Sequence, residues 1–374
     1  NANDDAQELS RRALYGGRSE AYLLGPVRER VWALDCQSMY PYIASREPVP
    51  VKLMSTYRTP TLYDLEYLIR TSSIVADVEI NTDEPAYPYR LDGMTTFPVG
   101  RFRTVLTTPE LAHAVDRGHI ETVKAMNVYW DDVIFHEFVS HFWELRSAAR
   151  DRGDLLTEGL AKALLNSLFG KFSQRGEIWK SIGRTADLSV RYWSEWDVAD
   201  QRSYQYRQLL GLIEEYETAV ETRESFPAIT AHITAAARMY LYQLIQEAGP
   251  ENTLYTDTDS LFVTADGLAR LDERIAEGEL GALRIQWMSD KLIINGVKDY
   301  MVDDVRTIKG IKYDAVERSP GRFVQAEYQS LESMVRSGSI GRRLITDVEK
   351  VLHREYLKGS VDRSGAVHPL RIRP

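Results

Sequence analysis

The chain has 374 residues, enough to enclose a large core and more than one subdomain. Its 55 acidic and 46 basic residues give a net charge of −9, which lacks the overall basic excess typical of nucleic-acid-binding proteins. The single cysteine, Cys36, excludes an intramolecular disulfide and favours a reducing compartment such as the cytoplasm. No Cys/His pattern indicates a zinc site, and no apolar run is long enough to span a bilayer, so we expect no membrane partner.

Two short patterns stand near the start of the chain. The sequence YGGR occupies residues 15–18, and the apolar run VWALD at residues 31–35 predicts a buried strand that ends on the carboxylate of Asp35. Pro41 stops any regular continuation of that strand. An Asp at a strand end is often only a turn residue, so this pattern alone leaves a turn and a metal-binding carboxylate both open.

The middle of the chain predicts alternating segments followed by a helical hairpin. Residues 57–135 alternate between extended and turn-like stretches, and residues 136–152 and 155–169 predict two helices. Lys162, Asn166 and Phe169 lie at i, i+4 and i+7 and share one face of the second helix, while Gly170 suits its C-terminus. Lys162 could neutralise a triphosphate and Phe169 could stack on a base, but an amphipathic helix with a solvated lysine fits equally well.

A second group of strands and a long helix follow. Residues 173–224 are polar and aromatic, with strands expected around Trp179 and around residues 192–193. Residues 228–247 predict a strong helix that is closed by Gly249 and Pro250. We expect this helix to pack behind the next strand of the chain.

The segment LYTDTDSLFV at residues 254–263 is the most informative stretch. An extended strand would place Asp257 and Asp259 on one face, whereas a tight hairpin would bring both carboxylates to its tip. Either arrangement concentrates negative charge, and a hard divalent cation such as Mg²⁺ is its natural partner. A strand end or turn with solvated carboxylates is the simpler alternative. With Asp35, these residues could supply the converging carboxylates that two-metal phosphoryl transfer requires.

Three patterns occur in a fixed order: D-x-x-S-M-Y-P from Asp35, K-x-x-x-N-S-x-F-G from Lys162 and Y-x-D-T-D-S from Tyr255. Together they resemble the A, B and C motifs of family B DNA polymerases, in particular the protein-primed branch of viruses, phages and linear plasmids. YGGR at 15–18, K-x-Y at 298–300 and KGI at 309–311 resemble further elements of that branch. Phe169 stands where the family usually has Tyr, and Met39 where it usually has Leu; neither change removes a charged group.

The resemblance implies an α+β fold shaped like a right hand. Its palm would be an antiparallel sheet backed by helices, with helical-hairpin fingers and a small thumb. The expected regions are 1–56 (palm with motif A), 57–135 (inserted connector), 136–172 (fingers), 173–224 (insertion), 225–313 (palm with motif C) and 314–374 (a thumb-like basic region). From residue 336 to the end, nine basic residues stand against four acidic ones, a net of +5 that suits phosphate contacts.

The resemblance also implies roles for individual residues. The expected catalytic residues are Asp35, Asp257 and Asp259, and two Mg²⁺ ions, with Mn²⁺ as an alternative, would be held by Asp35, Cys36 through its carbonyl, and Asp259. Arg146, Arg150 and Lys162 could face a triphosphate. The expected nucleotide-binding set is Ser38, Met39, Tyr40, Arg150, Lys162, Asn166 and Phe169, with Tyr40 as the steric gate against a ribose 2′-hydroxyl. The expected DNA-binding set is Tyr15, Gly16, Gly17, Arg18, Gly170, Thr258, Lys298, Tyr300 and Lys309.

The resemblance implies template-directed DNA synthesis from dNTPs on a primer–template, in the cytoplasm or at a viral replication site in the host cell. A priming polymerase that starts from a terminal protein or from no primer would use the same acids, and a terminal protein or a separate exonuclease or processivity chain are expected partners. A catalytically dead DNA-binding factor would have lost one of the acids, and a nuclease would need a second acid cluster. Asp77 and Glu79 imitate the D-x-E of a proofreading exonuclease, but that domain precedes motif A in the family, so we expect no excision activity.

Overall fold

The computed structural model describes residues 2–197, 200–222, 224–328, 345–352 and 354–373, which fall into two compact units. The first unit comprises Asn1–Ser173, Phe226–Thr307 and Arg354–Pro374, and the second comprises Gln174–Ser225 and Ile308–His353. The predicted thumb-like region 314–374 is therefore corrected, because it is divided between the units. The last residues join the first unit, where Arg354 pairs with Asp299 at 2.7 Å and the Lys358 ammonium donates to the Ser19 carbonyl.

A five-stranded antiparallel sheet holds the three acidic residues of the sequence motifs. Its strands follow the order β1-β14-β15-β3-β16. They are β1 (Ser19–Ala21), β14 (Thr253–Asp257), β15 (Ser260–Val263), β3 (Val31–Cys36) and β16 (Leu283–Ser289). β3 has neighbours on both sides, which explains why the apolar run at residues 31–35 reads as a buried strand.

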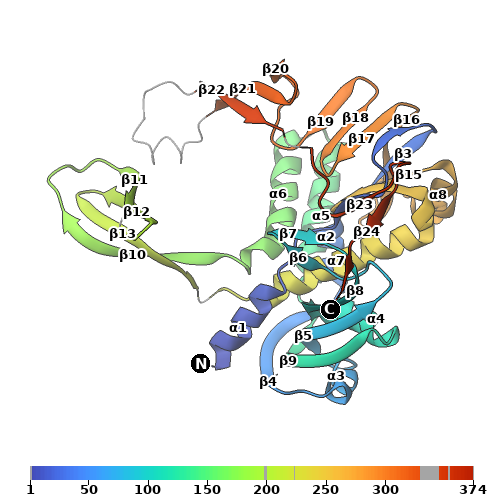
Figure 1. Cartoon of the computed structure of the whole chain (residues 1–374). Coiled ribbons are helices and arrows are strands. Elements are labelled where there is room, and N and C mark those ends of the chain that lie inside the picture. Colours follow the sequence, from blue (N-terminus) through green and yellow to red (C-terminus); the bar gives the residue numbers. More distant parts are fainter. Residues whose placement is uncertain (1, 198–199, 223, 329–344, 353, 374) are drawn as a thin grey trace. The chain divides into compact units, whose positions relative to one another are not determined.

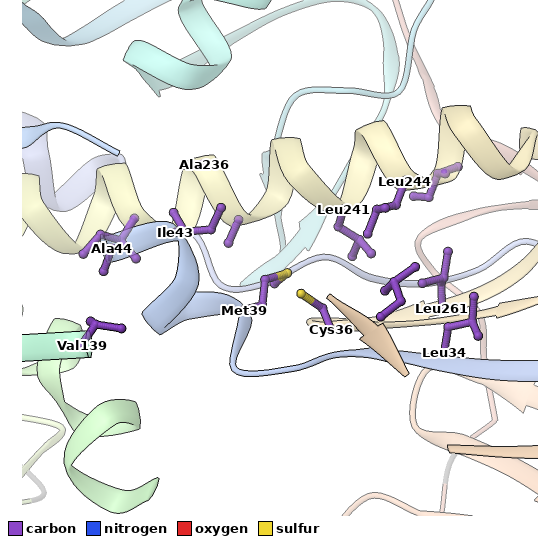
Figure 2. Close-up of a cluster of buried hydrophobic side chains, with 14 of the residues drawn as sticks. Leu34, Cys36, Met39, Ile43, Ala44, Val139, Ala236, Leu241, Leu244 and Leu261 are labelled. Carbon is purple, nitrogen blue, oxygen red and sulfur yellow. The ribbon is translucent and has the colours of Figure 1, made fainter. Parts of the chain in front are cut away.

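Helix α7 (Pro227–Ala248) confirms the helix predicted over 228–247. Pro227 occupies the first helical position, and Gly249 follows the last one with a φ of 89°. Eighteen of its 22 residues are buried, so this helix is enclosed and not amphipathic. Figure 2 shows Leu241 and Leu244 directed toward Leu34 and Leu261 of the sheet, in a cluster of buried side chains.

The opposite side of α7 packs against a second five-stranded sheet, through Met239 and Tyr242 (Figure 1). This sheet has the order β25-β8-β5-β9-β4, and only β25 is parallel to its neighbour. Its strands are β25 (Arg371–Ile372), β8 (Val99–Thr107), β5 (Ser73–Thr82), β9 (Ile120–Asp132) and β4 (Val49–Tyr57). Most of the predicted connector region thus forms a core of its own within the first unit. The hairpin of β6 (Tyr89–Leu91) and β7 (Met94–Thr96) lies between its strands in sequence.

Two helices in this region were missed by the description of 57–135 as extended and turn-like. They are α3 (Leu62–Leu68) and α4 (Thr108–Asp116). Thr61 and Asp64 form a capping box at the start of α3, and Pro109 lies in the first turn of α4. Both are recognisable start signals in the sequence.

The predicted helical hairpin is confirmed as α5 (His136–Asp151) and α6 (Leu155–Lys171), which pack against each other. Asp154 caps α6, because its side chain accepts a hydrogen bond from the Thr157 amide at 3.1 Å. Val139 of α5 packs in the same core as α2 (Met39–Arg46) and α7 (Figure 2), and Leu165 of α6 belongs to this core as well. The hairpin is therefore fixed beside the end of β3.

The first unit is completed by short elements. These are α1 (Ala2–Arg12), α8 (Ala265–Arg270), β2 (Gly25–Val27), β17 (Leu292–Gly296), β18 (Asp299–Val302), β23 (Gly359–Val361) and β24 (Val367–Pro369). β19 (Val305–Ile308) extends the β2-β17-β18 sheet at the boundary of the unit. None of the helices described is long and apolar enough to cross a membrane.

The second unit contains a four-stranded sheet within the predicted insertion. It is formed by β10 (Arg175–Arg184), β11 (Arg191–Asp197), β12 (Arg202–Leu209) and β13 (Leu212–Glu221), so the strands expected around Trp179 and residues 192–193 are confirmed. A three-stranded sheet of β20 (Val316–Ser319), β21 (Arg322–Tyr328) and β22 (Ile345–Val351) follows. Arg336, Arg342 and Arg343 of the basic C-terminal set lie outside the described residues.

Candidate active site

The two acidic motifs meet at the ends of three neighbouring strands. β14 and β15 form a tight hairpin whose turn is Thr258 and Asp259, so the hairpin alternative holds and the single extended strand does not. Thr258 adopts a left-handed conformation with a φ of 64°, and its amide donates to the Arg18 carbonyl at 2.7 Å. Ser260 pairs with Asp35, and the Cys36 amide donates to the Asp259 carbonyl at 2.8 Å. Asp35 and Asp259 consequently converge.

The electrostatics of this pair favour a bound cation. Burial and the nearby Asp35 carboxylate raise the pKa of Asp259 to about 6. No Lys, Arg or His among the described residues forms an ion pair with Asp259. Asp257 is held differently, because it accepts from the Ser19 hydroxyl and pairs with the Lys298 ammonium, each at 2.8 Å. The turn therefore separates Asp257, which has an ion-pair partner, from Asp259, which has none among the described residues.

Asp35 has a cationic partner that the sequence patterns did not reveal. Arg284 lies opposite Asp35 on the neighbouring strand β16; its Nε donates to Asp35 Oδ2 at 3.0 Å, and its Nη2 lies 2.9 Å from the same oxygen. The two residues are 249 positions apart in the chain. No local pattern could have predicted this pair, because it depends on the register of β16 against β3.

The donor set fits Mg²⁺ that is shared with a substrate. Within the described part of the chain, no three His, Cys, Asp or Glu residues are grouped so that they could enclose a metal ion by themselves. Mg²⁺ is commonly held by one or two carboxylates together with water and phosphate oxygens, which is what Asp35 and Asp259 offer. The Cys36 thiol donates to the Gly281 carbonyl, and burial raises its pKa far above the ordinary value. The thiol therefore stays protonated, and Cys36 can serve only through its carbonyl.

An aromatic pair stands beside the acids. Tyr40 of α2 stacks on Phe169 of α6, with ring centroids 4.6 Å apart and an angle of 27° between the planes. Burial raises the pKa of Tyr40 to about 12, so its hydroxyl stays protonated at neutral pH. The structure thus brings together two residues from motifs that are more than a hundred positions apart. The Phe169 ring supports Tyr40 in this structure and is itself half-buried.

The basic residues of the helical hairpin have distinct surroundings. Arg146 Nη1 donates to the Ser38 hydroxyl at 2.9 Å, and burial lowers the pKa of Arg146, with Arg150 and Arg284 adding repulsion. Arg150 pairs with Glu158 at 3.1 Å. Arg146 is therefore the cation of this helix that lies nearest the start of α2. Lys162 and Asn166 are exposed on α6, as is Gly170 at its end.

Residues 3–245 match the family model for DNA polymerase type B, organellar and viral. The chain belongs to this family. Over 310 residues it is 26% identical to the DNA-directed DNA polymerase of Enterobacteria phage PRD1. This alignment covers 78% of this chain and 50% of that protein. Over 181 residues it is 28% identical to a probable DNA polymerase of Agaricus bitorquis. This alignment covers 46% of this chain and 22% of that protein. The chain thus spans half or less of the length of these relatives.

Solved structures of phi29 DNA polymerase are similar in fold. The complex with single-stranded DNA gives a TM-score of 0.58 at 16% identity, covering 84% of this chain and 52% of that one. The ternary complex with primer-template DNA and incoming nucleotide gives 0.56 at 15% identity, covering 93% and 55%. These likenesses show that this type B family member has a polymerase fold of mixed helices and sheets.

The expected roles of Met39 in nucleotide binding and of Arg18 in DNA binding are corrected, because both side chains are buried. Met39 is 1% exposed and packs in the core with Cys36 and α7, so it does not present its side chain to a nucleotide (Figure 2). Arg18 is 2% exposed, pairs with Glu20 at 2.8 Å and lies 4.2 Å from the centre of the Phe97 ring. The Arg18 side chain is therefore occupied within the protein and is not exposed to a DNA strand.

A buried ion pair that the sequence patterns did not predict holds the loop at residues 15–18. Arg238 of α7 pairs with Glu110 at 2.7 Å, and both side chains are 1% exposed. The same guanidinium donates to the carbonyls of Tyr15 and Gly16, each at 3.0 Å. Tyr15 is itself buried and bonded to the Thr104 hydroxyl. The expected DNA contact of the Tyr15 side chain is corrected for this reason.

Gly17 lies where the loop approaches the turn of the acidic hairpin. A Cβ at Gly17 would stand 2.8 Å from a side-chain carbon of Thr258 and 3.0 Å from the Tyr40 hydroxyl. We predict that Gly17→Ala displaces this turn, costs about 1–3 kcal/mol of stability and lowers nucleotide incorporation at least about tenfold. Primer-extension rates and thermal unfolding measure both effects. Gly16→Ala should cost no stability, since its Cβ would meet nothing within 4 Å, and an equal loss in both variants would contradict the prediction.

Lys298, Tyr300 and Lys309, which are also expected to contact DNA, have different surroundings. Lys298 pairs with Asp257, and its amide donates to the Tyr255 hydroxyl at 2.9 Å. Tyr300 is half-buried in an aromatic cluster with Tyr255 and Phe262. Lys309 is exposed and belongs to the second unit. Their contacts with DNA stay predictions.

Asp77 and Glu79, which imitate an exonuclease motif, are neutralised by cations. Asp77 is 1% exposed and pairs with Arg12 at 2.6 Å and Arg103 at 2.7 Å, while Glu79 pairs with Lys124 at 3.1 Å. We predict that the purified chain does not shorten single-stranded DNA in the presence of Mg²⁺. Asp77→Asn should instead lower the free energy of unfolding by about 1–3 kcal/mol, because it weakens charged hydrogen bonds to a buried group. Mg²⁺-dependent shortening that disappears in a folded Asp77→Asn variant would overturn this interpretation.

Proposed function

We propose that this chain is the polymerising part of a DNA polymerase that transfers nucleotides from dNTPs to a primer 3′-hydroxyl, as directed by a template. The observation that carries the proposal is the convergence of Asp35 and Asp259 at adjacent strand ends, beside the Tyr40–Phe169 stack. Family membership and the phi29 polymerase fold support it. The names of the two relatives, a DNA-directed DNA polymerase and a probable DNA polymerase, agree with this chemistry.

In this proposal the sheet of β1, β14, β15, β3 and β16 is the palm, and the α5–α6 hairpin is the fingers. The strands β20–β22 of the second unit would serve as a thumb, which narrows the region first expected at 314–374. Residues 1–56 and 225–313 would supply the palm, 57–135 the connector, 136–172 the fingers and 173–224 the insertion.

Each residue near the acids has a task in the proposed reaction. Two bound Mg²⁺ ions would lower the pKa of the primer 3′-hydroxyl and stabilise the charge on the phosphates and the departing pyrophosphate. Asp35 and Asp259 would hold the ions, with the Cys36 carbonyl as a further oxygen donor. Asp257 would orient Lys298, which lies 2.8 Å away and would bind the primer strand. Ser38, Arg146, Arg150, Lys162 and Asn166 would bind and orient the triphosphate, and Tyr40 on Phe169 would limit the space below the sugar.

Primer extension on templates of different sequence tests this proposal. With Mg²⁺ and four dNTPs, the product should stop at the template end, and omission of one dNTP should stop it before the first complementary position. Products that ignore the template would indicate a terminal transferase, and no incorporation by the folded chain with Mg²⁺ or Mn²⁺ would overturn the proposal. Reactions without primer, and with a candidate terminal protein, distinguish an initiating polymerase from one that only elongates.

A further inference from the structure

The ion pair between Asp35 and Arg284 occupies one of the two carboxylate oxygens of Asp35. Arg284 Nε donates to Asp35 Oδ2 at 3.0 Å, and Arg284 Nη2 lies 2.9 Å from the same oxygen. The guanidinium charge and its Nε hydrogen bond make Oδ2 a poorer ligand for a second cation. A cation at Asp35 Oδ2 therefore has to displace the guanidinium or share the oxygen with it.

Arg284 is placed so that it can leave. Its side chain is 42% exposed, whereas Asp35 is 14% exposed. The next residue of β16, Ile285, is exposed as well. An ion pair of this exposure contributes little to folding stability, roughly 0–1 kcal/mol, so breaking it costs little.

The surrounding charges also favour a movable cation. Burial and the nearby cations Arg150 and Arg284 lower the pKa of Arg146, which shows that positive charge is crowded on this side of the site. On the other side, Asp259 has no described cationic partner, and Lys298 is engaged by Asp257. Of the two carboxylates Asp35 and Asp259, Arg284 forms an ion pair only with Asp35 in the described structure.

We propose that Arg284 is an internal counter-cation that competes with divalent metal for Asp35, so that metal loads fully only when the phosphates of a nucleotide add further ligands. This inference rests on the proposed polymerase function and assigns to a residue outside the sequence motifs a positioning role in metal binding. Its consequence is a low metal affinity of the free protein. A Mg²⁺–nucleotide complex overcomes the competition, because its phosphates supply oxygen ligands that the protein lacks.

Titration of the nucleotide-free and DNA-free chain with Mn²⁺, followed by the electron paramagnetic resonance signal of unbound Mn²⁺, tests the competition directly. Arg284→Gln should bind Mn²⁺ about three- to tenfold more tightly than the wild type at low ionic strength. Arg284→Lys, which keeps the charge with a single donor group, should lie between the two. Thermal unfolding should confirm that both variants are folded.

Arg274→Gln is the matched control. Arg274 forms a comparable two-donor pair with Glu247 and is 46% exposed, but it does not contact the acidic motifs. Its Mn²⁺ affinity should equal that of the wild type. Unchanged or weaker Mn²⁺ binding by Arg284→Gln would overturn the competition.

Asp35→Asn separates this inference from the proposed function. If Asp35→Asn loses Mn²⁺ binding while Arg284→Gln leaves it unchanged, the metal site stands and only the competition is wrong. If Asp35→Asn binds Mn²⁺ as the wild type does, Asp35 holds no metal, and the two-metal reaction proposed above is wrong together with the competition.

Discussion

Asp259→Asn should abolish nucleotide incorporation and leave the folded protein at least as stable as the wild type. The buried Asp259 carboxylate stands beside Asp35 without a described cation of its own, so its negative charge opposes folding in the absence of metal. Asparagine keeps the size and the turn but removes that charge. Activity and stability are therefore expected to change in opposite directions, as they often do at catalytic sites.

Asp35→Asn should also abolish incorporation, with a stability change within about 1 kcal/mol, since its ion pair with Arg284 is partly exposed. Asp257→Asn should be severe as well, because it removes the negative charge that pairs with Lys298. Single-nucleotide incorporation by rapid quench and thermal unfolding measure these effects. Asp290→Asn is a suitable control, since Asp290 forms an exposed pair with Arg30. Near-wild-type incorporation by either Asp35→Asn or Asp259→Asn would rule out the assignment.

The parts of the site that the sequence predicted are those set by local signals. Pro227, the apolar run of α7 and Gly249 determine that helix through a starting residue, a buried body and an end. The conformation of the acidic hairpin is only partly determined by local sequence, because the D-T-D step is compatible with a strand or with a turn. The choice of the turn depends on the Thr258 amide bonding to Arg18, which belongs to a distant loop.

The parts that the sequence could not predict are set by distant packing. Met39 and Tyr40 are adjacent on α2, yet one side chain enters the core and the other stacks on Phe169. Arg18 looks like a surface cation until Glu20 and Phe97 enclose it. The partner of Asp35 is likewise determined by strand register, which a single sequence does not contain. In contrast, the capping box at Thr61 was a readable signal for α3.

Tyr40→Ala should raise the use of ribonucleotides relative to deoxyribonucleotides. The Tyr40 ring stacks on Phe169, with ring centroids 4.6 Å apart, so this contact limits how far the ring can move away from a ribose. Removing the ring opens space for a 2′-hydroxyl. We expect the ratio of kcat/KM for rNTP over dNTP to rise on the order of tenfold or more, beyond any common loss of rate.

Two further variants show whether the effect is steric. Tyr40→Phe keeps the ring, so its rNTP/dNTP ratio should stay near the wild-type value, even if loss of the hydroxyl changes both rates. Phe169→Ala removes the support of the ring and should raise the ratio by less than Tyr40→Ala, because the tyrosine stays in place but gains freedom. A ratio that is unchanged in Tyr40→Ala, or a wild type that uses both nucleotides equally, would make Tyr40 a packing residue. The selection between RNA and DNA precursors would then have to arise elsewhere, and a priming activity that accepts ribonucleotides would become the better interpretation of this site.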